Sequence, residues 1–257
     1  MNRIEVRRLL TEAADPEYKE FNDKIANCQV IPSIGVRVPQ MRALAQKLAK
    51  DGWQEYLEEM EALAPVWQQD GRMTDPELFQ EEHMLQGMLI GYAKMDDAER
   101  VRHLDSWIPG IVSWADCDCC VSGFKFMKKN QDFWFDYSVS WLPEGKMGGK
   151  RKREDPAQEF CVRYVLVALM QHFINDTYME RVLEIIRVSD EEASPYYVKM
   201  AQAWALSVCF VKYREQTLQL FEAQSLTAWV QNKAIQKCRE SYRVSPEDKE
   251  LLKGLKM

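Results

Sequence analysis

The stretch Ser113-Trp114-Ala115-Asp116-Cys117-Asp118 opens a segment that runs to Asn130 and repeats its apolar residues with the period of a helix. If the segment is one helix, one side of it carries Trp114, Asp118, Ser122, Lys125 and Lys129. The other side carries Cys117, Cys120, Val121, Phe124 and Met127, which suits a protein core. An indole one turn before a carboxylate, followed by two ammonium groups, is a surface that suits a polyanion. The alternative is a solvated helix face with one amphipathic tryptophan, because charged helix faces are common.

The rest of the chain repeats this helical pattern, and no stretch alternates convincingly as a strand does, so we predict an all-α fold. The expected helices form seven pairs: 3–14 with 16–27, 39–49 with 52–62, 75–94 with 96–107, 113–130 with 133–141, 155–173 with 177–188, 196–212 with 214–223, and 226–242 with 245–256. Successive pairs start roughly 30 to 40 residues apart, which is typical of a degenerate HEAT-like α-solenoid. The concave side of such a stack is its natural binding surface.

Composition indicates a folded protein rich in helix formers. The 257 residues are 46% hydrophobic and 29% charged, with only 11 Gly and 10 Pro. We expect a single domain over residues 1–257, interrupted at 143–155 by a glycine-containing loop with the cations Lys146 and Lys150 to Arg153. No apolar run approaches the roughly 18 residues that span a bilayer, and Met1 to Arg8 lack a signal-peptide core. A cytoplasmic protein without a membrane partner is expected.

The seven cysteines are an odd number without regular spacing, which suits reduced thiols better than a disulfide framework. Cys117, Cys119 and Cys120 point in widely separated directions on a helix, and the histidines are scattered at His83, His103 and His172. We therefore expect buried thiols, and neither a metal nor a cofactor.

The net charge of −6 is unevenly distributed along the chain. Residues 51–120 hold 16 acidic and 4 basic side chains, whereas residues 199–257 hold 6 acidic and 10 basic ones. An acidic half and a basic half can coexist on a molecule whose basic part binds an anionic partner.

Arg163 and Trp204 each allow two interpretations. Arg163 lies beside the apolar stripe of its helix, near the N-terminal end, where a guanidinium can reach a phosphate on the concave side. Alternatively, it is a flanking arginine that directs its charge outward. Trp204 shares a side with Tyr197, Met200, Ala201 and Val208, so its spacing alone favours the core. We interpret five other tryptophans as packing residues, namely Trp67, Trp107, Trp134, Trp141 and Trp229.

Taken together, these residues make the chain resemble the AlkD-like DNA alkylation repair family over essentially its full length. The resemblance rests on five motifs in order: Gly35-Val36-Arg37-Val38-Pro39, Ser113 to Asp118, Glu159-Phe160-Cys161-Val162-Arg163, Tyr196 to Leu206, and Asn232-Lys233-Ala234-Ile235-Gln236-Lys237. It implies a right-handed stack of HEAT-like repeats that cups duplex DNA. In active members, it also implies hydrolysis of the N-glycosidic bond of alkylated purines.

The resemblance further implies roles for single residues. Trp114 and Asp118 match the family's Trp-x-x-x-Asp pair, Trp204 its second tryptophan, and Arg163 its phosphate-contacting arginine. We therefore expect Trp114, Asp118 and Trp204 to be catalytic, and four cations to contact DNA: Arg163, Lys125, Lys129 and Lys199.

The expected partner is double-stranded DNA containing alkylated bases, such as 3-methyladenine and 7-methylguanine, bound by a monomer. The segment before Trp114 is more acidic than the binding faces usual in the family. The alternative function is accordingly a non-catalytic protein that binds DNA structures or acts as a scaffold.

Overall fold

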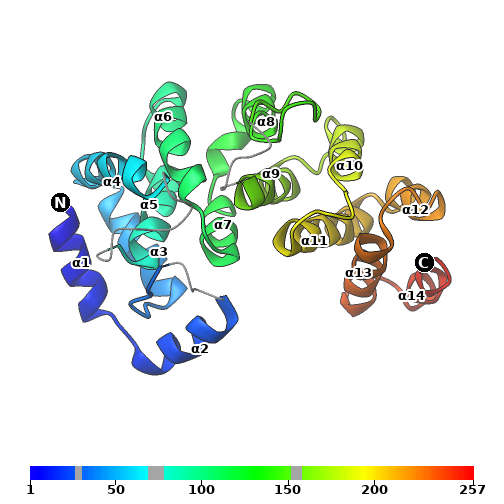
Figure 1. Ribbon diagram of the computed structural model, residues 1–257, viewed down its shortest axis with the longest axis horizontal. Helices are drawn as coiled ribbons and strands as arrows, with labels where there is room; N and C mark the ends of the chain where they lie inside the picture. Colours follow the sequence, from blue (N-terminus) through cyan, green and yellow to red (C-terminus); the bar gives the residue numbers. More distant parts are fainter. Residues whose placement is uncertain (27–30, 69–77, 152–157) are drawn as a thin grey trace. The chain divides into compact units, whose positions relative to one another are not determined.

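The computed structural model describes residues 1–26, 31–68, 78–151 and 158–257 (Figure 1). These residues form fourteen α-helices and two 3-10 helices, and none of them forms a strand, which confirms the all-α prediction for this part of the chain. The chain divides into two compact units, Met1–Phe126 and Met127–Met257. The division lies upstream of the loop at 143–155, where the sequence placed the main break. A single domain and a right-handed stack over the whole chain stay predictions.

The first unit is built on a layer of three helices. Its elements are α1 (Arg3–Glu12), α2 (Pro16–Ala26), α3 (Val38–Leu48), α4 (Trp53–Gln68), α5 (Gln80–Tyr92), α6 (Asp97–Trp107), the 3-10 helix η1 (Ile108–Gly110) and α7 (Trp114–Val121). Helix α5 packs against both α3 and α7, while α4 packs against α1, α5 and α6. The largest fully buried side chains of this unit include Trp107, Tyr56 and Phe124. The core therefore lies around α5, and α5 positions α7.

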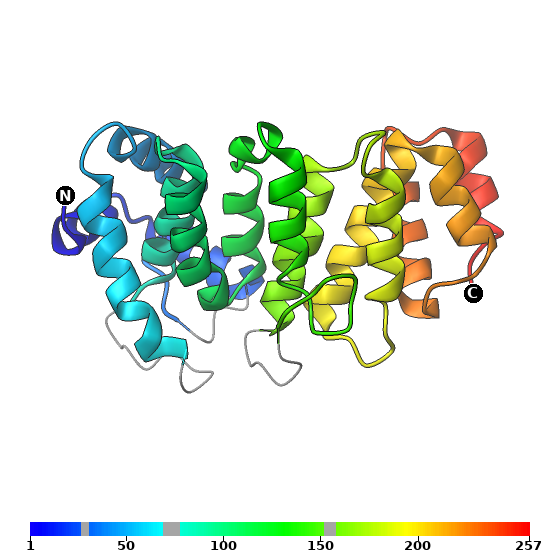
Figure 2. The ribbon, with the colours of Figure 1, turned by 90° about the horizontal axis from the view of Figure 1, so that it is seen from above.

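The second unit has two layers. Its helices are α8 (Gln131–Val139), α9 (Gln158–His172), α10 (Met179–Val188), α11 (Tyr196–Lys212), α12 (Arg214–Glu222), α13 (Ala228–Glu240) and α14 (Pro246–Lys253). Helix α11 packs against both α9 and α13, so these three form one layer. The second layer comprises α8 on α9, α10 on α9 and α11, α12 on α11, and α14 on α13; Figure 2 shows the helices of this unit side by side.

Capping residues explain where several helices begin. Five N-cap side chains accept a hydrogen bond from the backbone N–H three residues later: Asn2, Asp96, Ser113, Thr227 and Ser245. The predicted starts at Asp96 and at Ser245-Pro246 are confirmed. The predicted starts at Asp75-Pro76 and Asp155-Pro156 lie outside the described residues.

None of the helices in the described ranges is long and apolar enough to cross a membrane.

A buried carboxylate on α5 holds the loop that precedes α3. Glu81, which is 4% exposed, accepts hydrogen bonds from the backbone N–H groups of Ile34 (2.8 Å), Gly35 (2.7 Å) and Val36 (3.1 Å). Gly35 has a φ of 97°, and a Cβ there would lie 2.6 Å from Cβ of Lys19, so only glycine fits without strain. The motif that opens at Gly35 is therefore a structural clamp between α2, α3 and α5.

The helix that begins at Trp114 ends at Val121 rather than near Asn130, and this corrects the sequence prediction. Gly123 follows in a turn, with its N–H donating to the carbonyl of Cys120 at 2.8 Å. Phe124 then enters the core, where its ring lies 5.8 Å from that of Trp107 in an edge-on arrangement. Glycine is a poor helix former, and burial of Phe124 redirects the backbone.

As a consequence, Lys125 begins a separate 3-10 helix, η2 (Lys125–Lys128), and Lys129 lies beyond it. Neither lysine continues the side of α7 that carries Trp114 and Asp118, so the prediction of one continuous face is wrong. The predicted core side is confirmed, since each of its members is at most 1% exposed: Cys117, Cys120, Val121, Phe124 and Met127.

Candidate active site

Helix α7 is attached to α5 through its buried side. The hydroxyl of Ser113 accepts hydrogen bonds from the backbone N–H of Asp116 (3.2 Å) and from Nε2 of Gln80 (2.8 Å). One side chain thus caps α7 and ties it to the start of α5. Farther along, Sγ of Cys120 donates to the carbonyl of Met84 at 3.2 Å. These contacts fix the rotation of α7 about its axis.

The close approach of α5 and α7 depends on Gly87. A Cβ at this position would lie 2.6 Å from two ring atoms of Trp107 and 2.8 Å from Sγ of Cys120. Because protein cores are close-packed, a side chain here would push the two helices apart. Gly87 is therefore one of the residues that set the position of α7.

An imidazole and a carboxylate lie buried behind α7, and the sequence reasoning missed them. His83 and Asp116 are both fully buried, with His83 Nδ1 3.6 Å from Asp116 Oδ2. The His83 ring stacks on Trp107 at a centroid distance of 5.5 Å, and its Nε2 lies 3.2 Å from the Trp107 carbonyl. The only available signal was Asp116 itself, a carboxylate on the core side of α7. This pair supports α7 from the side opposite Asp118.

Trp114 and Asp118 lie one turn apart on α7, and both are partly exposed, as the sequence predicted. Nε1 of Trp114 donates to the carbonyl of Ile25 at 3.3 Å, near the end of α2. This bond holds the edge of the indole in place. Beside Asp118, burial raises the pKa of the Cys119 thiol to about 11, so Cys119 stays protonated at neutral pH. The site therefore presents an oriented indole and a carboxylate beside an unreactive thiol.

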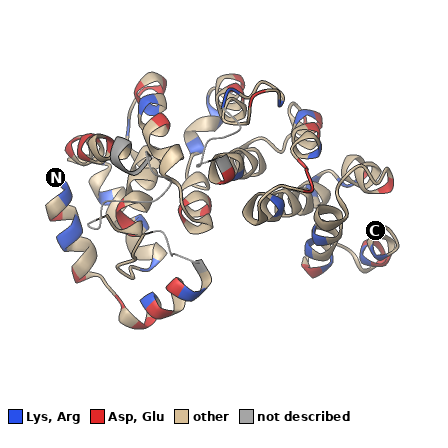
Figure 3. Ribbon diagram, in the orientation of Figure 1, with Lys and Arg blue, Asp and Glu red and all other residues tan. Residues whose placement is uncertain are grey.

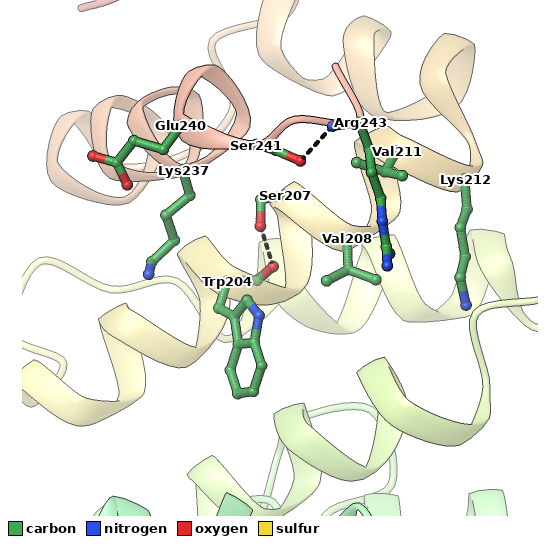
Figure 4. Close-up of a pocket in the computed structure, with 9 residues that line it drawn as sticks. All are labelled: Trp204, Ser207, Val208, Val211, Lys212, Lys237, Glu240, Ser241 and Arg243. Atoms are coloured by element: carbon green, nitrogen blue, oxygen red, sulfur yellow. Dashed lines mark hydrogen bonds between the residues drawn. The ribbon is translucent and has the colours of Figure 1, made fainter.

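In the second unit, Trp204 is partly exposed and lines a pocket of about 350 Å³ (Figure 4). The pocket is lined by α11, α13 and the turn before α14, through Trp204, Ser207, Val208, Val211, Lys212, Lys237, Glu240, Ser241 and Arg243. Spacing alone favoured the core for Trp204, and the pocket corrects that interpretation. The indole is available to a ligand.

Arg163 is only 5% exposed, whereas both sequence interpretations placed its guanidinium at the surface. Its Nη1 donates to the carbonyl of Tyr197 at 2.8 Å, and Glu159 accepts from the backbone N–H of the same residue at 3.0 Å. The two side chains of α9 thus hold the first turn of α11. The alternative of an outward-directed flanking arginine is wrong, and contact between Arg163 and a phosphate stays a prediction.

The three lysines expected to contact DNA differ in their surroundings. Lys125 and Lys129 are exposed. The ammonium group of Lys199 donates to the carbonyl of Glu192 at 2.6 Å and lies 6.0 Å from the ring centroid of Trp229. Contact of these lysines with DNA stays a prediction.

Trp229 contacts neighbouring side chains, as a packing residue does, but it is partly exposed rather than buried in the core. Besides Lys199, Lys233 lies 5.8 Å from its ring centroid, and the Tyr196 ring lies 6.0 Å away. The packing interpretation is confirmed for Trp107, Trp134 and Trp141, which are at most 7% exposed. The side chain of Trp67 lies outside what the structure describes.

Part of the basic loop at 143–155 is folded against its own unit. Lys146 pairs with Glu191 at 2.5 Å, and the Arg151 guanidinium lies 4.7 Å from the ring centroid of Trp141. Lys150 is exposed, whereas Lys152 and Arg153 lie outside the described residues. At least two of the five cations of the loop therefore have structural contacts.

Charged side chains are distributed differently on α2 and α13. Figure 3 shows both signs of charge on α2, whereas α13 carries three cations, Lys233, Lys237 and Arg239, and one acid, Glu240. Over the described ranges, no group of three or more His, Cys, Asp or Glu side chains could hold a metal ion. The cysteines described there are all free thiols.

The helical units and the Trp114–Asp118 pair define an all-α protein with a partly exposed indole–carboxylate site. A family model described as DNA alkylation repair enzyme matches residues 6–141, more than half of the chain, so the chain belongs to this family. Membership implies a role in DNA alkylation repair and confirms the predicted family; of the five motifs, the matched range contains those at Gly35 and Ser113. Comparisons with curated proteins and with solved structures gave no match.

The matched range includes Trp114 and Asp118 but neither Arg163 nor Trp204. The first two residues belong to the first unit, and the other two belong to the second. Convergence of these four residues on one surface stays a prediction.

Proposed function

We propose that this protein is a DNA glycosylase that hydrolyses the N-glycosidic bond of cationic alkylated purines, such as 3-methyladenine and 7-methylguanine, in duplex DNA. The observation that carries the proposal is the Trp114–Asp118 pair on the partly exposed side of α7, within the range that matches the family. The buried side of the same helix is fixed by hydrogen bonds to α5, so the pair is positioned before any ligand binds.

The chemistry of the lesion requires little from the protein beyond electrostatics. Alkylation at N3 or N7 makes the purine cationic, so it leaves C1′ as a neutral base with the bonding electron pair. Positive charge then develops on the sugar, water adds to C1′, and a proton is released. A preorganised carboxylate beside C1′ stabilises that charge. We assign this role to Asp118, which also accepts a hydrogen bond from the attacking water.

The two indoles are proposed to contact the deoxyribose of the lesion and to stabilise its positive charge. The face of an indole attracts a neighbouring cation and packs on the apolar surface of deoxyribose. Trp114 suits this role because its Nε1–H bond to Ile25 sets the ring before binding. We assign the same role to Trp204, whose ring is accessible at its pocket.

Binding of the duplex is proposed to depend on phosphate contacts by Lys125, Lys129 and Lys199, with Arg163 as a further candidate. Such contacts make affinity fall steeply with salt, and they position the duplex without reading its sequence.

The proposal is tested by base release from three otherwise identical duplexes that contain 7-methylguanine, uracil or no lesion. The side chains assigned to the site include no acid that could protonate a leaving base, so only a base that is already cationic leaves readily. We expect release of 7-methylguanine and none of uracil. Release of uracil at a comparable rate would contradict the mechanism.

The second candidate function is a non-catalytic protein that binds DNA structures or acts as a scaffold. It is favoured by the 16 acidic against 4 basic residues between positions 51 and 120, which weaken attraction of DNA to the first unit. Binding of branched or bulged duplexes without release of any methylated purine would support this candidate over the glycosylase.

A further inference from the structure

We infer that the pocket beside Trp204 is a subsite for one nucleotide of a bound strand, which holds a phosphate together with its sugar and base. The inference rests on the proposed function in one respect, namely that DNA supplies the nucleotide. The pocket lies wholly within the second unit, between α11, α13 and the turn before α14.

Cationic side chains dominate the polar part of the pocket. Lys212 lies at the end of α11, Lys237 on α13 and Arg243 in the turn before α14. Within the described part of the chain, none of the three forms an ion pair with a carboxylate. In Figure 4 their side chains extend to the same side as the Trp204 indole. Three cations without acidic partners favour an anionic ligand.

The one carboxylate in the lining of the pocket does not neutralise its cations. Glu240 accepts a hydrogen bond from Nε2 of Gln236 at 2.7 Å, and in Figure 4 its carboxylate points away from Trp204. Its partner lies on the same helix, so the acid is engaged along α13 rather than with the pocket cations.

The rest of the lining suits a ring rather than a second charge. Trp204 offers a partly exposed indole, and Val208 and Val211 add aliphatic surface. The hydroxyl of Ser207 donates to the Trp204 carbonyl at 2.7 Å and is therefore already satisfied. At about 350 Å³, the pocket is within the size range of small-ligand sites and is larger than a phosphate alone requires. A cationic groove with an aromatic surface on which a base can stack is typical of proteins that bind a nucleic-acid strand.

A row of aromatic and basic residues leads along α13 into the pocket. Trp229, Lys233 and Lys237 follow one another at intervals of four residues, so they lie on one side of the helix. Lys199 and Lys233 both lie within about 6 Å of the Trp229 ring. This row continues the chemistry of the pocket over several residues, which favours a strand over a free anion.

The test follows the indole N–H resonance of Trp204 in the isotope-labelled full-length protein, with the Trp204→Phe variant used to assign it. The protein is titrated to millimolar concentrations with thymidine monophosphate, inorganic phosphate or thymidine. We expect the monophosphate to shift the Trp204 resonance and the other two probes to leave it nearly unchanged. Absence of a shift with the monophosphate, or an equal shift with inorganic phosphate, would overturn the nucleotide subsite.

A double variant, Lys237→Ser with Arg243→Ser, removes two of the cations. It should abolish the response to the monophosphate and lower the salt dependence of undamaged-duplex binding by about one unit, because both cations contact the same phosphate and each neutralised phosphate contributes roughly 0.9. The matched control, Lys253→Ser with Lys256→Ser, removes two cations of the C-terminal segment outside the pocket and should keep the response. A full response in the pocket variant would overturn the inference.

These readouts separate the subsite from the proposed chemistry. If the wild type releases no methylated purine but Trp204 responds to the monophosphate, the glycosylase proposal fails and the subsite stands. If methylated purines are released and Trp204 does not respond, the subsite alone fails.

Discussion

Replacement of Glu81 by alanine should destabilise the protein more than most single substitutions. The carboxylate is 4% exposed and accepts three backbone N–H bonds, from Ile34, Gly35 and Val36, at distances between 2.7 and 3.1 Å. Alanine leaves these three donors without their acceptor in a buried loop. The predicted consequence is loss of the clamp that joins this loop to α5.

The magnitude follows from the three bonds. A hydrogen bond to a charged group contributes about 1.5 to 3 kcal/mol, and three bonds to one carboxylate are not fully additive. We expect the free energy of unfolding to fall by about 4 kcal/mol, a large part of the roughly 5 to 15 kcal/mol of a typical protein. Glu81→Gln keeps one acceptor oxygen for Gly35 and Val36 but turns an NH2 group toward the N–H of Ile34, so it should lose about half as much.

The assay is urea unfolding followed by far-ultraviolet circular dichroism. Glu58→Ala, which removes an exposed carboxylate of α4, is the matched control and should stay within about 0.5 kcal/mol of the wild type. A Glu81→Ala variant within about 1 kcal/mol of the wild type would refute the clamp.

Three further predictions concern single side chains. Arg163→Ala should lower the free energy of unfolding by about 2 kcal/mol, because the buried bond to the Tyr197 carbonyl is lost, and an unchanged urea midpoint would contradict this bond. If the same variant also lowers the salt dependence of duplex binding by about one unit, Arg163 contacts a phosphate as well. The hydrogen bond from Arg214 holds the pKa of Asp248 below its usual 3.8, so the pair adds stability above that pH and loses it as pH falls through the lower folded-state pKa. Between about pH 5 and pH 2, the urea midpoint of Asp248→Asn should therefore fall less than that of the wild type, and parallel curves would argue against this pair. Burial raises the pKa of Cys119 to about 11, so iodoacetamide should label it more slowly at neutral pH in the native protein than in urea, as measured by mass spectrometry; equal rates would show that the thiol is accessible.

Much of the fold could be predicted because its determinants are local. Helical periodicity depends on neighbours three and four residues apart, and it located α11 at Tyr196–Lys212 with the bounds that the structure has. Capping residues such as Ser113 and Ser245 act on the next turn of chain, so their effect is also visible in the sequence. The core side of α7 was likewise predictable, since the hydrophobic pattern determines which side is buried.

The features that could not be predicted depend on contacts distant in sequence. The end of α7 at Val121 reflects burial of Phe124 against Trp107 as well as Gly123, and the glycine alone did not indicate where the helix would end. The His83–Asp116 pair joins two helices across 33 positions of the chain. Arg163 is buried because a carbonyl of α11 accepts its bond. Spacing alone therefore misjudges residues whose partners belong to another helix.

The central claim is that Asp118 stabilises positive charge on the sugar of a cationic lesion. Its most direct test is the single-turnover rate of 7-methylguanine release from a duplex by the wild type and by Asp118→Asn, with binding of the undamaged duplex measured in parallel. Asparagine keeps the shape but removes the charge, and loss of one preorganised electrostatic group costs on the order of 100-fold or more in rate. We predict a loss of at least that order with duplex binding largely retained, whereas an Asp118→Asn variant as fast as the wild type would contradict the claim.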